Sequence, residues 1–345
     1  MGLPKGRKDM DMKHGGNVWE GDAPENWLDF SANLRPEGTP RWVLEVMERA
    51  LADTRYYPDR ALSAARHGLA RYLGVKEACV LPTAGGAAAI DLMTASAKKR
   101  VRVLPVTFGE YRERAEVHGK PVCLWDGEGA PGDMLIFCNP NNPTGEVRSR
   151  EELRALSQRL SACGGELVVD EAFIDFCPEN SVRRDVHRGL TVVGSLTKTL
   201  CIPGVRLGYI CGEPERIAAL QRQALPWALG TLASAVAAAL PEHREEIKQD
   251  LARNLPRREA FQKELRALGA LVQEGHANFL LADLGRDMTG AAQRLKEKKI
   301  LVRTCASFGL PDSFLRLAVK REEENARFVR ELRDILEEES CAAKS

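Results

Sequence analysis

Short apolar segments recur through the middle of the chain, at the length and spacing of strands in a parallel sheet. They cover residues 101–106, 122–125, 134–138, 167–169, 190–193 and 207–211. Most are separated by stretches with helical spacing of apolar residues. Helices are the natural crossovers between parallel strands, because each connection must run back along the sheet. The pattern therefore predicts an α/β fold with a mainly parallel sheet.

From about residue 240 onward the pattern changes. A charged helical stretch at 242–268 is interrupted at Pro256, and short alternating segments follow at 279–282, 301–303 and 314–319. An amphipathic helix is predicted last, at 322–336. This order predicts a separate, smaller α+β domain.

Composition excludes several other classes of protein. Lys and Arg total 50 against 49 for Asp and Glu, so the net charge of +1 gives no electrostatic basis for binding nucleic acid or an anionic membrane. The longest apolar stretch, 227–240, is too short to span a bilayer. Nine scattered cysteines without a CxxC pair predict small buried side chains in a reducing cytoplasm. We therefore expect a soluble, cytoplasmic protein with no metal site.

One segment, SLTKTLCIPGVRLGY from Ser195, combines an amine with hydroxyl groups and a guanidinium. Lys198 lies three residues after Ser195 and eight before Arg206. A lysine amine can hold an aldehyde as a Schiff base, while Ser195, Thr197 and Arg206 can hydrogen-bond a phosphate. Pyridoxal 5′-phosphate has both groups. By itself, the segment is equally compatible with a hydroxyl-rich corner that has ordinary surface Lys and Arg residues.

Two upstream segments favour the cofactor. Asp170 follows the apolar run 167–169, so its carboxylate emerges at a strand end, where α/β sheets bind ligands. There it can pair with the protonated pyridine nitrogen. Asn142 lies in a proline-bracketed turn, where its amide can donate to the ring's 3′ oxygen, although such a loop alone is more often only a turn. Asn142, Asp170 and Lys198 in this order point to pyridoxal phosphate.

With these motifs the chain resembles the fold-type I pyridoxal phosphate enzymes, in the branch that holds histidinol-phosphate aminotransferases and the threonine-phosphate decarboxylases of cobalamin synthesis. NPNNPTG and SLTK with PGVRLG are typical of the branch, whereas HGGN, DFSAN and RTCASF favour the decarboxylases. The resemblance implies a large cofactor-binding domain at 46–240 with a mainly parallel seven-stranded sheet. An N-terminal arm at 1–45 would join the C-terminal small domain at 241–345.

The resemblance also implies further cofactor contacts. Gly85 and Gly86 precede a predicted helix, where backbone N–H groups can approach a phosphate, although Gly-Gly is usually a simple turn. Phe108 falls where relatives place an aromatic ring against the cofactor, although core packing is the commoner role. Tyr57 corresponds to a residue that reaches the cofactor phosphate of the neighbouring subunit. This implies a homodimer with shared active sites; the alternative is a packed aromatic turn before Pro58.

For the substrate, the resemblance places His14, Gly15, Asn33 and Arg303 around a phosphate and Arg316 at a carboxylate, with Asn142 also adjacent. A single arginine on a strand is more often a surface residue. Two of them in neighbouring predicted strands, at family positions, suggest a substrate with both anionic groups.

Phe173 and Cys305 also bear on the assignment. Many aminotransferases of the branch have a tyrosine three residues after the aspartate, and Phe173, which stands there, fits the decarboxylases. Cys305 lies beside candidate site residues, and core packing is favoured over a functional role.

These residues predict a carboxy-lyase that converts L-threonine O-3-phosphate to (R)-1-aminopropan-2-yl phosphate for the cobamide nucleotide loop. The alternatives are a decarboxylase that prefers L-serine O-phosphate, an aminotransferase acting on histidinol phosphate or a related amino acid, and a cofactor-binding regulator without turnover. The predicted partners are a small phosphorylated amino acid and a second copy of the chain.

Overall fold

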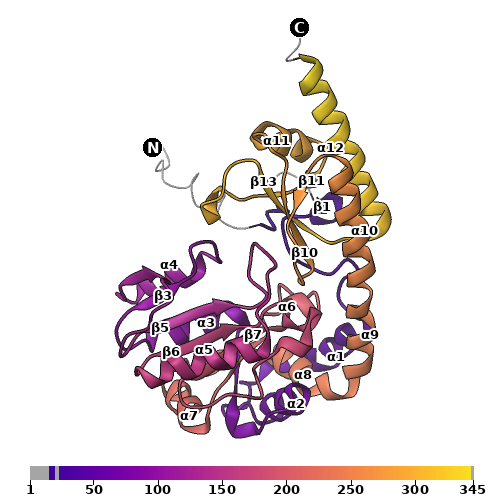
Figure 1. Cartoon of the computed structure of the whole chain (residues 1–345). Helices are drawn as coiled ribbons and strands as arrows, with labels where there is room; N and C mark the ends of the chain where they lie inside the picture. Colours follow the sequence, from indigo (N-terminus) through magenta and orange to yellow (C-terminus); the bar gives the residue numbers. More distant parts are fainter. Residues whose placement is uncertain (1–14, 20–22, 343–345) are drawn as a thin grey trace, which may run out of the picture. The chain divides into compact units, whose positions relative to one another are not determined.

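The computed structural model describes residues 15–19 and 23–342, which form two compact units (Figure 1). The large unit comprises Glu37–Asn142 and Glu146–Ala252. The small unit comprises Pro143–Gly145, the described residues up to Pro36, and those from Arg253 onward. The domain boundaries proposed from sequence, after residues 45 and 240, remain a prediction about domains; the compact units divide after Pro36 and Ala252.

A seven-stranded sheet forms the centre of the large unit, as predicted. In spatial order its strands are β2 (Val80–Thr83), β8 (Gly208–Cys211), β7 (Leu190–Ser195), β6 (Glu166–Asp170), β5 (Met134–Cys138), β3 (Val101–Val103) and β4 (Val122–Leu124). Only β8 runs antiparallel to its neighbours, so the sheet is mainly parallel.

Successive side chains along each strand point to opposite faces of the sheet, and both faces are apolar. In β5, Leu135 and Phe137 belong to one hydrophobic cluster, whereas Met134 and Ile136 belong to another on the opposite face. The first cluster is covered by α1 (Arg41–Ala50), α2 (Ser63–Leu73), α5 (Arg150–Ala162) and α8 (Thr231–Ala239). The second is covered by α3 (Gly85–Ala95), α4 (Glu110–Val117) and α7 (Pro214–Gln223). The remaining helices of the unit are α6 (Leu196–Thr199) and α9 (Arg244–Ala252).

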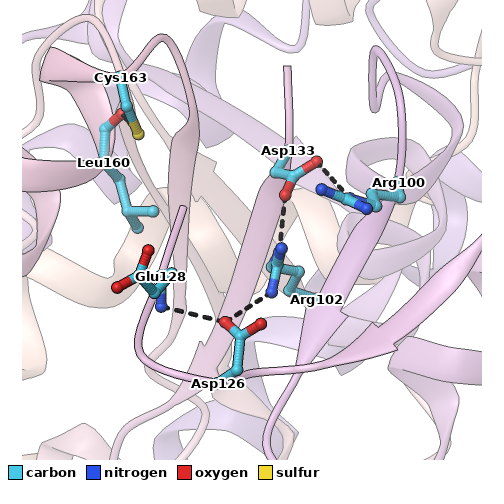
Figure 2. Close-up of polar contacts among 7 residues, drawn as sticks. All are labelled: Arg100, Arg102, Asp126, Glu128, Asp133, Leu160 and Cys163. Atoms are coloured by element: carbon cyan, nitrogen blue, oxygen red, sulfur yellow. Dashed lines mark hydrogen bonds and ion pairs between the residues drawn. The ribbon is translucent and has the colours of Figure 1, made fainter. Parts of the chain in front are cut away.

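Ion pairs fix one edge of this sheet (Figure 2). Asp133, at the start of β5, accepts hydrogen bonds from Arg100 Nε at 2.8 Å and from Arg102 Nε at 2.6 Å. Arg102 on β3 also donates through Nη1 to Asp126, which follows β4, at 2.7 Å. The Asp133 side chain is only 1% exposed, whereas that of Asp126 is 60% exposed. The Arg102 side chain therefore connects β3 with the residue before β5 and with the segment after β4.

The small unit has an antiparallel sheet in the order β12 (Arg303–Thr304), β13 (Phe314–Ala318), β10 (Phe279–Asp283) and β9 (Leu271–Val272). A second sheet pairs β1 (Leu28–Asp29) with β11 (Ile300–Leu301) in parallel. The helices are α10 (Asn254–Ala267), α11 (Thr289–Glu297) and α12 (Glu322–Ala342). Phe30, Phe261 and Phe328 pack against one another in its core, with ring centroids 4.8–5.9 Å apart.

Several elements differ from the sequence predictions, and three of the differences have a clear physical cause. The segment 301–303, predicted as one strand, divides into β11 and β12, which belong to different sheets. The helix break predicted at Pro256 occurs at Arg253, because a proline in the first turn of α10 lacks only an N–H that has no intrahelical acceptor. Strand β2 was missed because it contains Pro82, which an edge strand tolerates.

Candidate functional site

The glycines at the start of α3 lie against the residues predicted to bind a phosphate. Gly85 has φ +84°, and a Cβ atom there would lie 2.8 Å from Nη2 of Arg206. A Cβ atom on Gly86 would lie 3.1 Å from Cβ of Ser195. The missing side chains therefore allow the N-terminus of α3, the end of β7 and the loop after α6 to approach closely.

The polar groups at this place match a phosphate. The hydroxyl of Thr197 is buried and, within the described chain, has no hydrogen-bond partner. Its own N–H donates to Ser195 Oγ at 3.4 Å. Arg206 is exposed, and its Nη1 donates to the carbonyl of Pro203 at 3.1 Å. A buried hydroxyl, helix N–H groups and a guanidinium are together the donor set that a phosphate monoester requires. These residues fit the phosphate of pyridoxal phosphate.

Asp170 ends β6 as predicted, and it is buried. Its Oδ2 accepts a hydrogen bond from the Tyr111 hydroxyl at 2.6 Å, and its Oδ1 accepts one from the N–H of Ala172 at 2.9 Å. Burial raises the pKa of this carboxyl, while the two donors act in the opposite direction. Tyr111 was not predicted, because only the packing of α4 reveals that it contacts Asp170.

Phe108 and Asn142 reach the same carboxyl edge of the sheet from neighbouring loops. Phe108 is half-buried, with its ring edge-on to that of Tyr111 at 5.6 Å between centroids. Asn142 is buried. Its loop is held by Asn141, whose Nδ2 donates to the carbonyl of Val106 at 3.0 Å. The buried Phe173 follows Asp170 and has no group that could donate to a ring oxygen.

Lys198 lies in α6, a short helix that a hydrogen bond from the next residue holds in place. Thr199, the next residue, donates through Oγ1 to Asp175 Oδ2 at 2.8 Å, and Arg183 Nη1 lies 3.3 Å from Oδ1 of the same carboxylate. Lys198 itself is half-buried. Strands β6 and β7 are parallel neighbours. Asp170 at the end of β6 and Lys198 shortly after β7 therefore lie at the same edge of the sheet. The predicted cofactor residues of the large unit therefore gather at one edge of the sheet.

Tyr57 does not join that group. Its side chain lies on the surface of the large unit with 82% of its area exposed, and its ring centroid is 5.0 Å from that of Trp227. Tyr57, Tyr56 and Leu225 are among the most exposed large apolar side chains of the unit, and Trp227 is also exposed.

In the small unit, Arg303 and Arg316 are register partners on β12 and β13. Each is only 6% exposed. Nη2 of Arg316 donates to the carbonyl of Ser31 at 2.5 Å, and Nη2 of Arg303 donates to Ser307 Oγ at 2.6 Å. Burial lowers the pKa of both guanidinium groups, and the neighbouring charge of Arg303 helps to lower that of Arg316 to about 10.

Cys305 lies beside this pair of arginines and is fully buried. Burial raises the pKa of its thiol to about 11, although the arginine charges act in the opposite direction. The thiol is therefore neutral at physiological pH, as in a side chain that packs the core.

Of the N-terminal residues predicted to bind substrate, Asn33 lies in the segment 29–33 and Gly15 packs against it. Gly15 contacts this segment so closely that a Cβ atom would lie 2.2 Å from the carbonyl oxygen of Ser31. Asn33 is buried, and its Oδ1 has no hydrogen-bond partner among residues 15–19 and 23–342. An unmatched buried amide oxygen is costly, which is typical of a ligand-binding position. His14 lies outside the described residues.

The fold and these groups define a class of enzyme. The chain belongs to the aminotransferase class I and II family, whose model matches residues 25–332. This confirms the predicted fold-type I class of pyridoxal phosphate enzymes.

Among individual relatives, the chain is 31% identical to a threonine-phosphate decarboxylase of Salmonella typhimurium, over 94% of this chain and 96% of the relative. It is similar in structure to an L-threonine-O-3-phosphate decarboxylase from Porphyromonas gingivalis, with a TM-score of 0.82 and 25% identity. The match covers 89% of this chain and 99% of that structure. The structure also matches that of a histidinol-phosphate aminotransferase from Clostridium acetobutylicum, with a TM-score of 0.81 and 26% identity. This match covers 89% of this chain and 98% of the aminotransferase.

Proposed function

We propose that this protein is a pyridoxal phosphate-dependent decarboxylase that converts L-threonine O-3-phosphate to (R)-1-aminopropan-2-yl phosphate and CO2. The register pair Arg303 and Arg316 supports this most directly. Two desolvated guanidinium groups raise each other's energy, so an anionic ligand stabilises the pair. Threonine phosphate has a carboxylate and a phosphate, one for each arginine. The decarboxylase relatives support the same substrate.

The residues of the large unit are suited to hold the cofactor. When bound, pyridoxal phosphate supplies an electron sink for the bond that breaks at the substrate's Cα. Lys198 would hold its aldehyde carbon, and Ser195, Thr197 and Arg206 would bind its phosphate together with the N–H groups of Gly85 and Gly86. Asp170 would pair with the ring nitrogen, Phe108 would pack against the ring, and Asn142 would donate to its 3′ oxygen and border the substrate.

The proposed reaction assigns separate tasks to the chain's own groups. Arg316 binds the substrate carboxylate in a bidentate manner, which orients the bond between Cα and the carboxylate for cleavage. Arg303, Asn33, Gly15 and His14 bind the substrate phosphate. After CO2 has left, Lys198 Nζ delivers a proton to Cα.

An aminotransferase differs in which bond is cleaved, because there Lys198 would remove the proton from Cα. The solved aminotransferase with a TM-score of 0.81 shows that the fold is compatible with that chemistry. The buried Phe173 favours the decarboxylase, because it lacks the hydroxyl that many aminotransferases of the branch place there.

The test is to supply the purified protein with threonine phosphate, serine phosphate or histidinol phosphate, in the presence of 2-oxoglutarate. We expect CO2 release that is fastest with threonine phosphate, and little glutamate. A Lys198→Ala protein should release none. Glutamate formation that exceeds CO2 release would instead establish the aminotransferase.

We also propose a cytoplasmic homodimer in which Tyr57 contributes to the partner's active site. The exposure of Tyr57 and Leu225, at 82% and 79%, supports an interface on this face of the large unit. All nine cysteines are free, which agrees with a reducing compartment. Within the described residues, the helices are too short or too polar for any to cross a membrane.

A further inference from the structure

The hydroxyl of Tyr111 is fully buried and points at a carboxylate. Tyr111 is 0% exposed, and its hydroxyl donates to Asp170 Oδ2 at 2.6 Å. It lies one turn after Phe108, and its N–H is hydrogen-bonded to the Phe108 carbonyl at 3.4 Å. One turn of chain at the start of α4 therefore supplies both the aromatic ring predicted to pack on the cofactor and a donor to the aspartate.

We propose that Tyr111 is a positioning residue, whose hydroxyl fixes the Asp170 carboxylate and thereby sets how firmly the cofactor's ring nitrogen holds its proton. This inference rests on the proposed function, because it requires that Asp170 pairs with that nitrogen.

Few polar groups surround Asp170. Its two oxygens accept from Tyr111 and from the N–H of Ala172. Among the described residues, the Cys138 thiol at the end of β5 is a further titratable group that interacts with it. Burial raises the pKa of that thiol, so it is neutral and supplies no charge. In this buried site of low dielectric constant, each hydrogen-bond donor has a large effect on the basicity of the carboxylate.

Removal of the Tyr111 hydroxyl would make Asp170 a stronger base. The proton that the ring nitrogen shares with Asp170 would then move to the carboxylate, which leaves two neutral groups where a charged pair stood. The Ala172 N–H would still hold Oδ1, so Asp170 would stay in place. The variant therefore changes protonation more than structure.

The experiment compares Tyr111→Phe with Tyr72→Phe, since Tyr72 on α2 is also buried but lies in the other hydrophobic cluster. Each protein is loaded with cofactor labelled with ¹⁵N in the ring, and the ¹⁵N chemical shift is followed from pH 6 to 9. Thermal unfolding of the cofactor-free proteins measures any general loss of stability. Asp170→Asn shows the shift of a ring nitrogen whose ionic partner has been removed.

We expect Tyr111→Phe to lower the ratio of protonated to unprotonated ring nitrogen about ten-fold, the effect of losing one hydrogen bond to a charged group. Tyr72→Phe should leave the ratio at its wild-type value, even if it unfolds at a lower temperature. A wild-type ratio in the Tyr111→Phe holoenzyme would overturn the inference. If the wild-type protein did not bind the cofactor, the proposed function would fail instead.

Replacement of all five tyrosines with 3-fluorotyrosine provides a second test that preserves the side-chain shapes. Fluorine makes the phenol a stronger donor, so Asp170 becomes a weaker base. The ratio of protonated to unprotonated ring nitrogen should then rise, because the shared proton stays on the nitrogen. An unchanged or lower value would count against the role of Tyr111.

Discussion

Arg303 and Arg316 share one register position, yet we expect them to bind different parts of the substrate. Arg303→Ala should raise the KM for threonine phosphate by the equivalent of about 1.5–3 kcal/mol, the typical loss for a charge-assisted hydrogen bond. It should barely affect unphosphorylated threonine, which already lacks that contact. Arg316→Ala should instead lower kcat and allow some cleavage of the Cα–H bond.

Steady-state kinetics on both substrates measure these effects, with Arg266→Ala as the control. Arg266 forms an exposed ion pair with Glu274, so its loss should leave the kinetics unchanged. Equal losses on threonine and threonine phosphate in the Arg303 variant would show that this residue is structural.

A second prediction concerns Lys198 and Asp170. The purified protein should be yellow, and borohydride reduction should remove the absorption band and label Lys198. Lys198→Ala should be inactive. Asp170→Asn should lower kcat far more than cofactor affinity, because the phosphate contacts remain while the charge opposite the ring nitrogen is lost. Absorption spectra and cofactor titrations check both, and normal turnover by Lys198→Ala would rule out its role.

Asn142, Asp170 and Lys198 can be predicted from sequence by their chemical order, because Asp170 ends a strand whose apolar run is visible and the other two lie shortly after such strands. Tyr111 could not be found in this way, since its partner lies in β6, far along the chain. Thr199 and Asp175 are a similar case: the hydrogen bond that fixes α6 exists only once this helix meets the segment that follows β6. Side chains that act through another residue have no pattern of their own in one sequence.

The ion pairs at the edge of the large sheet give a third prediction. Asp133 would be costly to bury alone, but hydrogen bonds from Arg100 and Arg102 hold the pKa of this carboxyl below its usual value. Asp133→Asn should therefore lower the free energy of unfolding by about 2–3 kcal/mol at neutral pH, because it leaves the buried Arg102 with a weaker partner. Asp126→Asn, at the exposed partner of Arg102, should cost much less.

The pH dependence follows from the lowered pKa. Asp133 stabilises the fold above the pKa that the carboxyl has when unfolded, and this contribution is lost as the pH falls through the lower folded value. The difference between wild type and Asp133→Asn should therefore shrink in acid. Urea denaturation from pH 7 down to pH 3 measures it, and a difference that stays constant over this range would refute the assignment.

Regular strands were the easiest elements to predict, and short ones the hardest. The limits of β5 agree with the predicted 134–138, because its residues are buried on both faces and form an unbroken apolar run. The segment 301–303 looks like one strand, but its first residue pairs with β1 and its last with β13. No local pattern separates these cases, since the partners come from opposite ends of the chain.

The proposed dimer leads to a fourth prediction, which is tested with mixed dimers of two variants. Lys198→Ala should be inactive and Tyr57→Phe impaired, each as a homodimer. If Tyr57 serves the partner's site, mixed dimers should recover part of the activity, because one of the two sites then contains both intact residues. Tyr56→Phe, at the exposed neighbouring tyrosine, should be nearly as active as wild type by itself. Sedimentation that showed an active monomer would refute shared sites.

The segment Pro143–Gly145 belongs to the small unit although the residues on both sides of it belong to the large one. Gly145 accepts a hydrogen bond from His276 N at 2.9 Å, and a Cβ atom on Gly275 would lie 3.0 Å from Cα of Gly145. The two glycines must therefore remain compatible during evolution. A gene crossover that exchanged only the codons after residue 252 would bring Gly145 of one parent against position 275 of the other. Such a chimaera should fold well only if the second parent also has glycine at position 275, or if the exchange includes the loop Pro143–Gly145.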